Sequence, residues 1–368
     1  MRKIRVLVVD DSTVIRRLLT DSLASDPSLE VAGTAANGKI ALAKIPQLNP
    51  DVITLDMEMP EMDGLATLIE IRKLYPKLPV IMFSTLTQRG AEATLEALSR
   101  GANDYVTKPA NVGSVTAALQ SVRNELVPKL KAFCPWFSAQ SDSGSGPRPA
   151  FSPTLNNPQK LASNLNRIDI VAIGASTGGP NALQAVLSRI PADFPVPIVI
   201  VQHMPPIFTK HLADRLDQLC PLHVGEAQHF EPIVAGGVYV APGDFHMLVR
   251  RDRNAIRIDL NQGTPENSCR PAVDVLFRSV TETYGPNVLS IVLTGMGQDG
   301  ARSCELIRKA GGRVIAQDEA TSVVWGMPGA VAQAGLTDHI LPLDKIADEI
   351  VRVTFQGRKS RTLEKVGI

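Results

Sequence analysis

The amino-acid sequence predicts two α/β domains, each built on a doubly wound, mainly parallel sheet. Short apolar runs alternate with amphipathic stretches over residues 1–125 and again over 168–355, a pattern typical of βαβ units. A chain of 368 residues also exceeds the size at which one hydrophobic core stops growing, roughly 250 to 300 residues. Between the two regions the alternation is lost, so we expect the domain boundary there.

The first region contains five apolar runs that predict strands. Amphipathic stretches long enough for helices follow them, as in consecutive parallel strands joined by crossovers. We therefore expect five strands and five helices in one compact domain over residues 1–125. The expected strands are Ile4–Val9, Val31–Ala36, Val52–Leu55, Val80–Phe83 and Asp104–Val106.

Two segments outside these regions lack the composition of a packed domain. Residues 126–167 are predicted to be a flexible linker, because Pro128 interrupts the helical pattern and residues 138–149 are rich in Ser, Gly and Pro. Residues 356–368 are basic and are predicted to be a frayed tail.

Composition excludes several classes of protein. The formal net charge of +1 and the lack of a basic helix or helix-turn-helix pattern argue against nucleic acid as a partner. The first apolar run ends at Asp10 and Asp11, before the length of a signal peptide, and no run reaches the ~20 apolar residues of a membrane span. The four cysteines lack metal-ligand spacing, which favours reduced thiols and a cytoplasmic location.

Charged side chains follow three strands of the first domain. Asp10 and Asp11 follow the first strand, Asp56 the third and Lys108 the fifth. Carboxylates are the ligands that Mg²⁺ prefers, so the three aspartates, with the backbone carbonyl of Glu58, predict a magnesium site. Asp56 is predicted to accept a phosphoryl group whose oxygens are neutralised by the metal and Lys108.

A hydroxyl completes this set, because Ser84 follows the fourth strand and is predicted to hydrogen-bond the transferred phosphoryl group. Taken together, these residues resemble the receiver domain of two-component response regulators. The resemblance implies a flavodoxin-like (βα)5 fold, phosphorylation of Asp56 by a histidine kinase, Mg²⁺ binding by Asp10 and Asp11, and transmission of the change by Ser84 and Lys108.

The second domain presents a serine, a histidine and an aspartate after three separate strands. Ser176 lies in a glycine-rich turn, His203 follows the apolar run 198–201, and Asp299 follows the run 288–293. Acyl transfer needs a nucleophile, a general base, an acid that orients the base, and donors for the oxyanion. We assign Ser176, His203 and Asp299 to the first three roles and the backbone amides of Thr177 and Met296 to the oxyanion hole.

Two other interpretations of the glycine-rich turn remain open. Residues 174–178 also match the G-x-S-x-G nucleophile elbow of α/β-hydrolases, which requires a histidine after the acid, and His339 is the histidine in that position. A dinucleotide-binding loop is disfavoured, because Ser176 replaces the second glycine of G-x-G-x-x-G. We prefer His203, because the stiff Met204-Pro205-Pro206 turn that follows it would fix the ring.

The motifs Gly174 to Pro180, Gln202 to Met204 and Leu293 to Gly300 together resemble the catalytic domain of chemotaxis protein-glutamate methylesterases. The resemblance implies hydrolysis of glutamate γ-methyl esters, and deamidation of glutamines, on methyl-accepting chemoreceptors, without a cofactor for hydrolysis. It also implies a chemotaxis histidine kinase as phosphodonor and peripheral association with receptor arrays, without membrane insertion.

An output domain that only binds a protein or DNA is the alternative from a different class. It predicts that Ser176→Ala leaves the output unchanged, whereas a serine hydrolase should lose at least ~10³-fold in turnover. In the hydrolase interpretation, we expect the unphosphorylated first domain to cover the Ser176 cleft and phosphorylation of Asp56 to uncover it.

Overall fold

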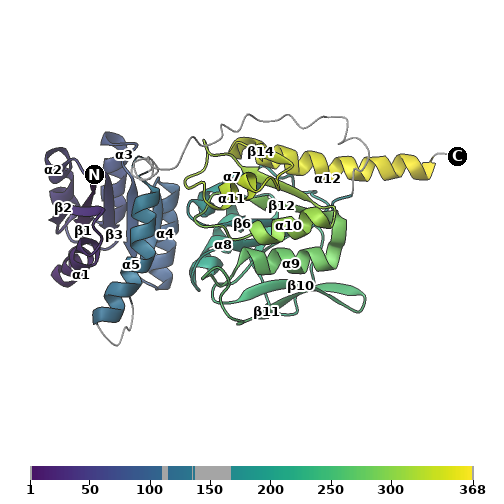
Figure 1. Ribbon diagram of the computed structural model, residues 1–368, viewed down its shortest axis with the longest axis horizontal. Coiled ribbons are helices and arrows are strands. Elements are labelled where there is room, and N and C mark those ends of the chain that lie inside the picture. Colours follow the sequence, from purple (N-terminus) through teal and green to yellow (C-terminus); the bar gives the residue numbers. More distant parts are fainter. Residues whose placement is uncertain (1, 110–114, 135, 137–166, 367–368) are drawn as a thin grey trace. The chain divides into compact units, whose positions relative to one another are not determined.

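The structure, a computed structural model, describes residues 2–109, 115–134, 136 and 167–366. The chain divides into two compact units, residues 1–150 and 151–368, and each is built on a parallel sheet (Figure 1). The predicted division into two α/β domains is thus confirmed in its architecture. None of the described helices has the length and apolar character needed to cross a membrane.

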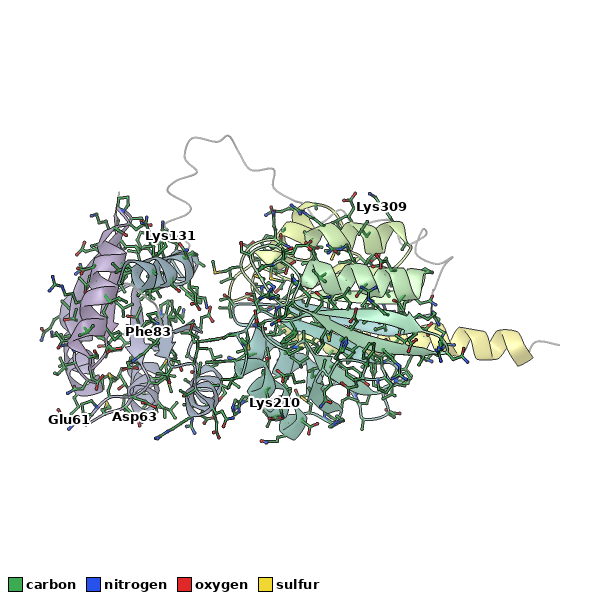
Figure 2. All side chains as sticks on the ribbon, turned by 90° about the horizontal axis from the view of Figure 1, so that it is seen from below. Glu61, Asp63, Phe83, Lys131, Lys210 and Lys309 are labelled. Carbon is green, nitrogen blue, oxygen red and sulfur yellow. The ribbon has the colours of Figure 1, made fainter. Side chains whose placement is uncertain are left out.

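The first unit has a five-stranded sheet in the order β2-β1-β3-β4-β5, with every neighbouring pair parallel. Its strands are β1 (Ile4–Val9), β2 (Leu29–Ala35), β3 (Val52–Asp56), β4 (Val80–Ser84) and β5 (Asp104–Thr107). Its helices are α1 (Thr13–Ala24), α2 (Gly38–Leu48), α3 (Gly64–Leu74), α4 (Gln88–Ser99) and α5 (Val115–Ala132). Side chains of α1 and α5 share one core with β1, while α2, α3 and α4 contact one another in series. Phe83 of β4 lies inside the unit, and Glu61 and Asp63 lie at its periphery (Figure 2).

The predicted end of the first domain at residue 125 is wrong, because α5 continues through Pro128 to Ala132. Leu126, Val127 and Leu130 are buried in the core, and Lys131 donates to Asp26 at 2.8 Å. Proline inside a helix costs about 3 kcal/mol, and burial of these aliphatic side chains offsets that cost. The linker predicted over 126–167 therefore begins too early, and its residues 137–166 lie outside the described part of the chain.

The second unit has a seven-stranded sheet in the order β14-β13-β12-β6-β7-β9-β8, again with parallel neighbours. Its strands are β6 (Ile170–Ala175), β7 (Ile198–Gln202), β8 (His223–Glu226), β9 (Gly237–Val240), β12 (Val288–Val292), β13 (Arg313–Gln317) and β14 (His339–Leu341). A separate antiparallel hairpin is formed by β10 (His246–Asp252) and β11 (Ala255–Asn261).

The helices of the second unit are α7 (Gly179–Leu187), α8 (Phe208–Leu219), α9 (Val273–Tyr284), α10 (Ala301–Lys309), α11 (Met327–Gln333) and α12 (Leu343–Val366). Buried residues of α9, α10 and α11 share one core with β6, β12 and the hairpin, and α9 and α10 lie side by side (Figure 1). Helix α12 runs through most of the tail predicted over 356–368, so that prediction is wrong up to residue 366. Arg358 explains part of this order, because its guanidinium donates to the carbonyls of Ile168 and Pro195 at 3.4 Å.

In both sheets the strand order reverses beside the first strand of the unit. In the first unit the chain moves from β1 to β2 on one side and to β3 on the other, and in the second unit β6 has β7 on one side and β12 on the other. Ligands of open α/β sheets bind at the carboxyl ends of the strands that flank such a switch point. These two edges are therefore where functional side chains are expected.

Candidate functional site

The acidic cluster of the first unit lies at its switch point. Asp10 follows β1 and Asp56 ends β3, and one carboxylate oxygen from each of Asp10, Asp11 and Asp56 lies within 4.8 Å of the others. Lys108 Nζ lies 2.7 Å from Asp56 Oδ1 and 3.2 Å from Asp10 Oδ2. The structure thus brings together the three predicted acids and the predicted lysine.

The charges of this cluster are not balanced by the chain alone. Burial raises the pKa of Asp56 to about 6, and the neighbouring Asp10 adds to the effect against the opposing pull of Lys108. Within the described ranges, the buried Oδ2 of Asp56 accepts no hydrogen bond, and the buried Oδ2 of Asp10 has only the ion pair with Lys108. Hard, anionic oxygens with open coordination fit a divalent cation such as Mg²⁺, so the residues present are compatible with the expected metal.

Ser84 and Glu58 occupy different places around this cluster. Ser84 is buried, and its Oγ lies 2.7 Å from Thr94 Oγ1 and 3.2 Å from the carbonyl of Gly90, so it is bonded to α4. Glu58 is exposed, and its backbone N–H is 3.4 Å from Asp56 Oδ1. The metal-binding role of the Glu58 carbonyl stays a prediction.

The serine and histidine of the second unit follow neighbouring strands. Ala175 at the end of β6 pairs with Gln202 at the end of β7, and His203 donates its backbone N–H to the Ala175 carbonyl at 3.1 Å. Gln202 Nε2 donates to the carbonyl of Ser176 at 2.9 Å and lies 3.3 Å from that of His203. The register of two parallel strands therefore places Ser176 beside His203.

Two glycines make room for Ser176. A Cβ added to Gly295 would lie 2.8 Å from Ser176 Cβ and 2.5 Å from Met327 Sδ. A Cβ added to Gly179, the first residue of α7, would lie 1.9 Å from Gln202 Oε1. Because real Cβ contacts are never so short, larger residues at either position would displace the serine or its support.

Asp299 is a buried carboxylate whose two oxygens accept four hydrogen bonds. His203 Nε2 lies 2.8 Å from Oδ2, which also accepts from the backbone N–H of Val273 at 2.7 Å. Oδ1 accepts from Asn267 Nδ2 at 2.7 Å and from the backbone N–H of Asp274 at 3.0 Å. Burial alone would raise the pKa of Asp299, but the bonds from His203 and from the first turn of α9 lower it. Asp299 is therefore held as an anion facing the imidazole.

The ring of His203 is oriented by this carboxylate. Because Nε2 faces Asp299, Nδ1 is the nitrogen left to take a proton, and it lies 3.7 Å from Cys269 Sγ. Burial disfavours the charged imidazole, yet the contacts to Asp299 and Cys269 outweigh burial and raise the pKa of His203 to about 9. No hydrogen bond joins Ser176 to His203 in the ranges that the structure describes. Such bonds often tighten only when substrate is present.

The loop after β12 presents an unused donor. The backbone N–H of Met296 has no acceptor among the residues that the structure describes. Gly326 packs against this loop, since a Cβ there would lie 2.7 Å from Gly295 O and 2.9 Å from Gly297 N. Thr177 is buried, and its carbonyl accepts from Thr294 Oγ1 at 2.9 Å. The oxyanion roles of Thr177 and Met296 stay predictions.

Comparison with known proteins identifies the two domains that carry these sites. Residues 171–350 match the family model described as CheB methylesterase, and residues 6–120 match the response regulator receiver domain. A relative from Trichodesmium erythraeum is 53% identical over 96% of this chain and 99% of its own length. This chain belongs to the CheB methylesterase family.

Further relatives of this CheB-family chain cover it almost completely. One from Nocardioides is 52% identical over 98% of both chains and, like the Trichodesmium protein, is named protein-glutamate methylesterase/protein-glutamine glutaminase. The crystal structure of the Thermotoga maritima CheB methylesterase catalytic domain is 42% identical, covers 50% of this chain and 98% of that domain, and superposes with a TM-score of 0.50.

The arrangement of this CheB-family chain argues against the α/β-hydrolase order. His339 begins β14, and its Nε2 lies 3.4 Å from Glu349. Asp299 instead contacts His203, so the order serine, histidine, acid fits the geometry and the order serine, acid, histidine does not.

Sequence reasoning missed the segment that supports Asp299. Asn267 and Cys269 lie in the loop before α9, and Asp274 lies in its first turn. The acid at the start of an amphipathic run signals a helix N-terminus, but nothing in the sequence shows that this terminus points at residue 299. The N-terminus of α9 reaches Asp299 because the helix packs across β6 and β12, which is a tertiary contact.

Proposed function

We propose that this chain is a phosphorylation-activated protein-glutamate methylesterase and protein-glutamine glutaminase. Its substrates are glutamate γ-methyl esters and certain glutamines on methyl-accepting chemoreceptors, and its product is a receptor glutamate. The single observation that carries the proposal is the His203–Asp299 pair beside Ser176 at the switch point of the larger sheet. The names of the full-length relatives support the substrate class.

Each residue of the proposed site has its own role in the hydrolysis. Ser176 Oγ attacks the γ-carbonyl carbon while His203 Nδ1 accepts the hydroxyl proton, and Asp299 stabilises the imidazolium that forms. The backbone amides of Met296 and Thr177 donate to the oxyanion of the tetrahedral intermediate. His203 then protonates the leaving methoxide or amide nitrogen, so methanol or ammonia departs and an acyl-serine remains. Water, deprotonated by His203, attacks the acyl carbon. The bond from that carbon to Ser176 Oγ then breaks, His203 returns its proton to Oγ, and the released glutamate side chain ionises in water.

The receiver unit controls this hydrolase through Asp56. A chemotaxis histidine kinase is the proposed phosphodonor, and Asp56 attacks its phosphoryl group. Mg²⁺, held by Asp10, Asp11, Asp56 and the Glu58 carbonyl, would supply positive charge to the phosphoryl oxygens. Lys108 already contacts Asp56 and would pair with the same oxygens.

Ser84 is the proposed relay from the phosphoryl group to α4. Its hydroxyl now contacts Thr94 and the carbonyl of Gly90, both in α4. Turning toward the phosphoryl group would break these contacts and release the first turn of the helix. We place the enzyme in the cytoplasm, at receptor arrays and peripheral to the membrane.

The test is methanol release from methylated receptor membranes by the full chain, with and without a small-molecule phosphodonor plus Mg²⁺. Ser176→Ala should lower turnover by at least ~10³-fold, and Ser188→Ala, an exposed serine at the end of α7, should not. If the wild-type protein cleaves no ester under any condition, the second unit acts as a binding module instead.

A further inference from the structure

One side-chain amide joins two buried carboxylates behind the His203–Asp299 pair. Asn267 Nδ2 donates to Asp299 Oδ1 at 2.7 Å and to Asp274 Oδ2 at 3.0 Å. Asp299 is 2% exposed and Asp274 is fully buried. Two buried carboxylates that accept from the same nitrogen lie close enough to repel each other unless donors lie between them. The NH₂ group of Asn267 supplies those donors.

We propose that Asn267 is a positioning residue for the hydrolysis, which keeps Asp299 ionised and aimed at His203 by bridging it to Asp274. This inference rests on the proposed function, because it assigns Asn267 to the machinery of the same reaction. Asn267 does not touch the substrate in this proposal, and it acts only through Asp299.

The orientation of the amide is determined by its two neighbours. A carboxylate only accepts hydrogen bonds, so the NH₂ group and not the carbonyl oxygen of Asn267 must face both acids. Asp274 is itself fixed, because its Oδ1 accepts from the backbone N–H of Ser303 in α10 at 2.9 Å. The carbonyl of Asp274 also accepts from Ser303 Oγ at 2.8 Å. The amide therefore connects Asp299 to a rigid junction of α9 and α10.

The backbone at this position also selects the residue. Asn267 has φ 52°, in the left-handed region that asparagine, aspartate and glycine tolerate better than other residues. Asn267→Gly thus removes the amide while keeping an accessible backbone, and Asn267→Asp keeps the shape but exchanges a donor for an acceptor. These two variants separate the side chain's chemistry from the loop's conformation.

Among the described residues, Glu266 and Cys269 are the other titratable side chains that interact with Asp299 or His203. Glu266 is paired with Arg278 at 2.7 Å, so its charge is largely balanced. Cys269 lies against His203 Nδ1, on the far side of the ring from Asp299. Asn267 is thus, with His203, one of the two side chains that donate to Asp299 among the described residues.

Loss of the amide should make Asp299 hold a proton more tightly. With one donor fewer, the Asp299 anion is less stabilised and attracts the imidazolium of His203 more strongly, so the pKa of His203 should rise. Asn267→Asp adds a third carboxylate and should raise it further. Because the general base must be unprotonated, the acid limb of the pH profile of kcat/KM should move to higher pH in both variants.

The experiment measures methanol release by the full chain across pH for wild type, Asn267→Gly, Asn267→Asp and the control Asn254→Asp, an exposed residue of the β10–β11 turn. We expect kcat to fall roughly tenfold in Asn267→Gly and about a hundredfold in Asn267→Asp, with KM nearly unchanged, since a hydrogen bond to a charged group is worth about that much. Asn254→Asp should behave as wild type. A wild-type kcat and pH profile in Asn267→Asp would overturn the proposal, as would a loss confined to KM.

A second measurement keeps the inference independent of activity and of poor folding. The pKa of the His203 ring is followed by NMR in the wild type and in Asn267→Gly, the milder variant, below its unfolding temperature. A higher ring pKa in the variant supports the positioning role, and an unchanged one contradicts it. If the wild type releases no methanol, the proposed function fails, while the ring titration still decides whether the amide acts on the His203–Asp299 pair.

Discussion

The two functional sites lie at equivalent places in their sheets but are completed in opposite ways. In the receiver unit, Lys108 is shared by Asp10 and Asp56, the buried Oδ2 of Asp56 accepts no hydrogen bond within the described residues, and burial raises the pKa of Asp56 to about 6. In the catalytic unit, Asp299 is equally buried, accepts four hydrogen bonds and has a lowered pKa. The same position in a parallel sheet thus holds one site in which a single lysine faces three acids and one in which hydrogen-bond donors satisfy both oxygens of the acid.

This difference indicates two kinds of task. A site that must bind a metal and a phosphoryl group reversibly has to leave acceptors unsatisfied, and it bears that cost in stability until the ligands arrive. A site that must stabilise charge developing in a transition state works best when its dipoles are already fixed. The predictions below test this comparison in decreasing order of expected effect.

Removing the general base should have the largest effect. His203→Ala should lower kcat by ~10³-fold or more, since the proton from Ser176 then has no acceptor. His339→Ala should leave kcat within a factor of about two, because that ring contacts Glu349. Single-turnover methanol release compares the two. Equal losses in both variants would contradict the idea that residues 176, 203 and 299 form a complete site.

A single methyl group should disturb the catalytic site. Gly295→Ala would bring a Cβ within 2.8 Å of Ser176 Cβ and 2.5 Å of Met327 Sδ, so the nucleophile must move. A misplacement of about 1 Å can cost about a hundredfold in rate, and we expect a loss of that order in kcat. Gly225→Ala, in β8, is the matched control, because no atom beyond its chain neighbours lies within 4 Å of the added Cβ.

Preventing phosphorylation should remove the stimulation and spare the basal rate. Asp56→Asn, or EDTA added to the wild type, should abolish the roughly tenfold increase that a phosphodonor produces. Glu61→Gln, at the periphery of the same unit (Figure 2), should retain it. The readouts are methanol release and phosphoprotein formation. Full stimulation of Asp56→Asn would show that the unsatisfied acids of the receiver have another purpose.

The smallest predicted effect concerns pH. The pKa of His203 is raised to about 9, partly by Cys269, and the protonated ring cannot accept a proton, so kcat/KM should rise with pH until about 9. Cys269→Ala removes one contact that favours the charged ring, so its acid limb should lie at lower pH. Cys220→Ala, at the end of α8, is the control. An acid limb that moves upward in Cys269→Ala would reverse this assignment.

Much of the fold could be predicted because parallel strands that are buried on both faces appear as continuous apolar runs. The strands β3 and β7 are fully buried, and their sequence ranges were predicted nearly to the residue. The error at the end of α5 has a local cause. Pro128 is a strong breaker signal, but the packing of Leu126 and Leu130 against the core is a tertiary effect that a local pattern does not contain.

The catalytic site was predictable to the extent that its parts follow strands. Ser176, His203 and Asp299 each follow an apolar run, so their convergence could be inferred from sheet geometry. Asn267 and Asp274 do not follow strands, and their role depends on where α9 begins in space. The predicted Ser84 relay is a different case, because the hydroxyl is bonded to α4 and its turn toward the phosphoryl group stays a prediction.

The order of strands in the larger sheet limits when the second unit can fold during synthesis. Strand β6, which directly precedes the nucleophile Ser176, pairs with β12. Ile170 therefore cannot form this pairing until its partner Val288 has been synthesised. Pairing between such distant segments is slow, and it cannot occur before the later segment has been synthesised. Asp299 leaves the ribosome later still. The Ser176 loop is therefore synthesised long before its partners. The nascent chain can become an active hydrolase only after β12 has paired with β6 and Asp299 has reached His203.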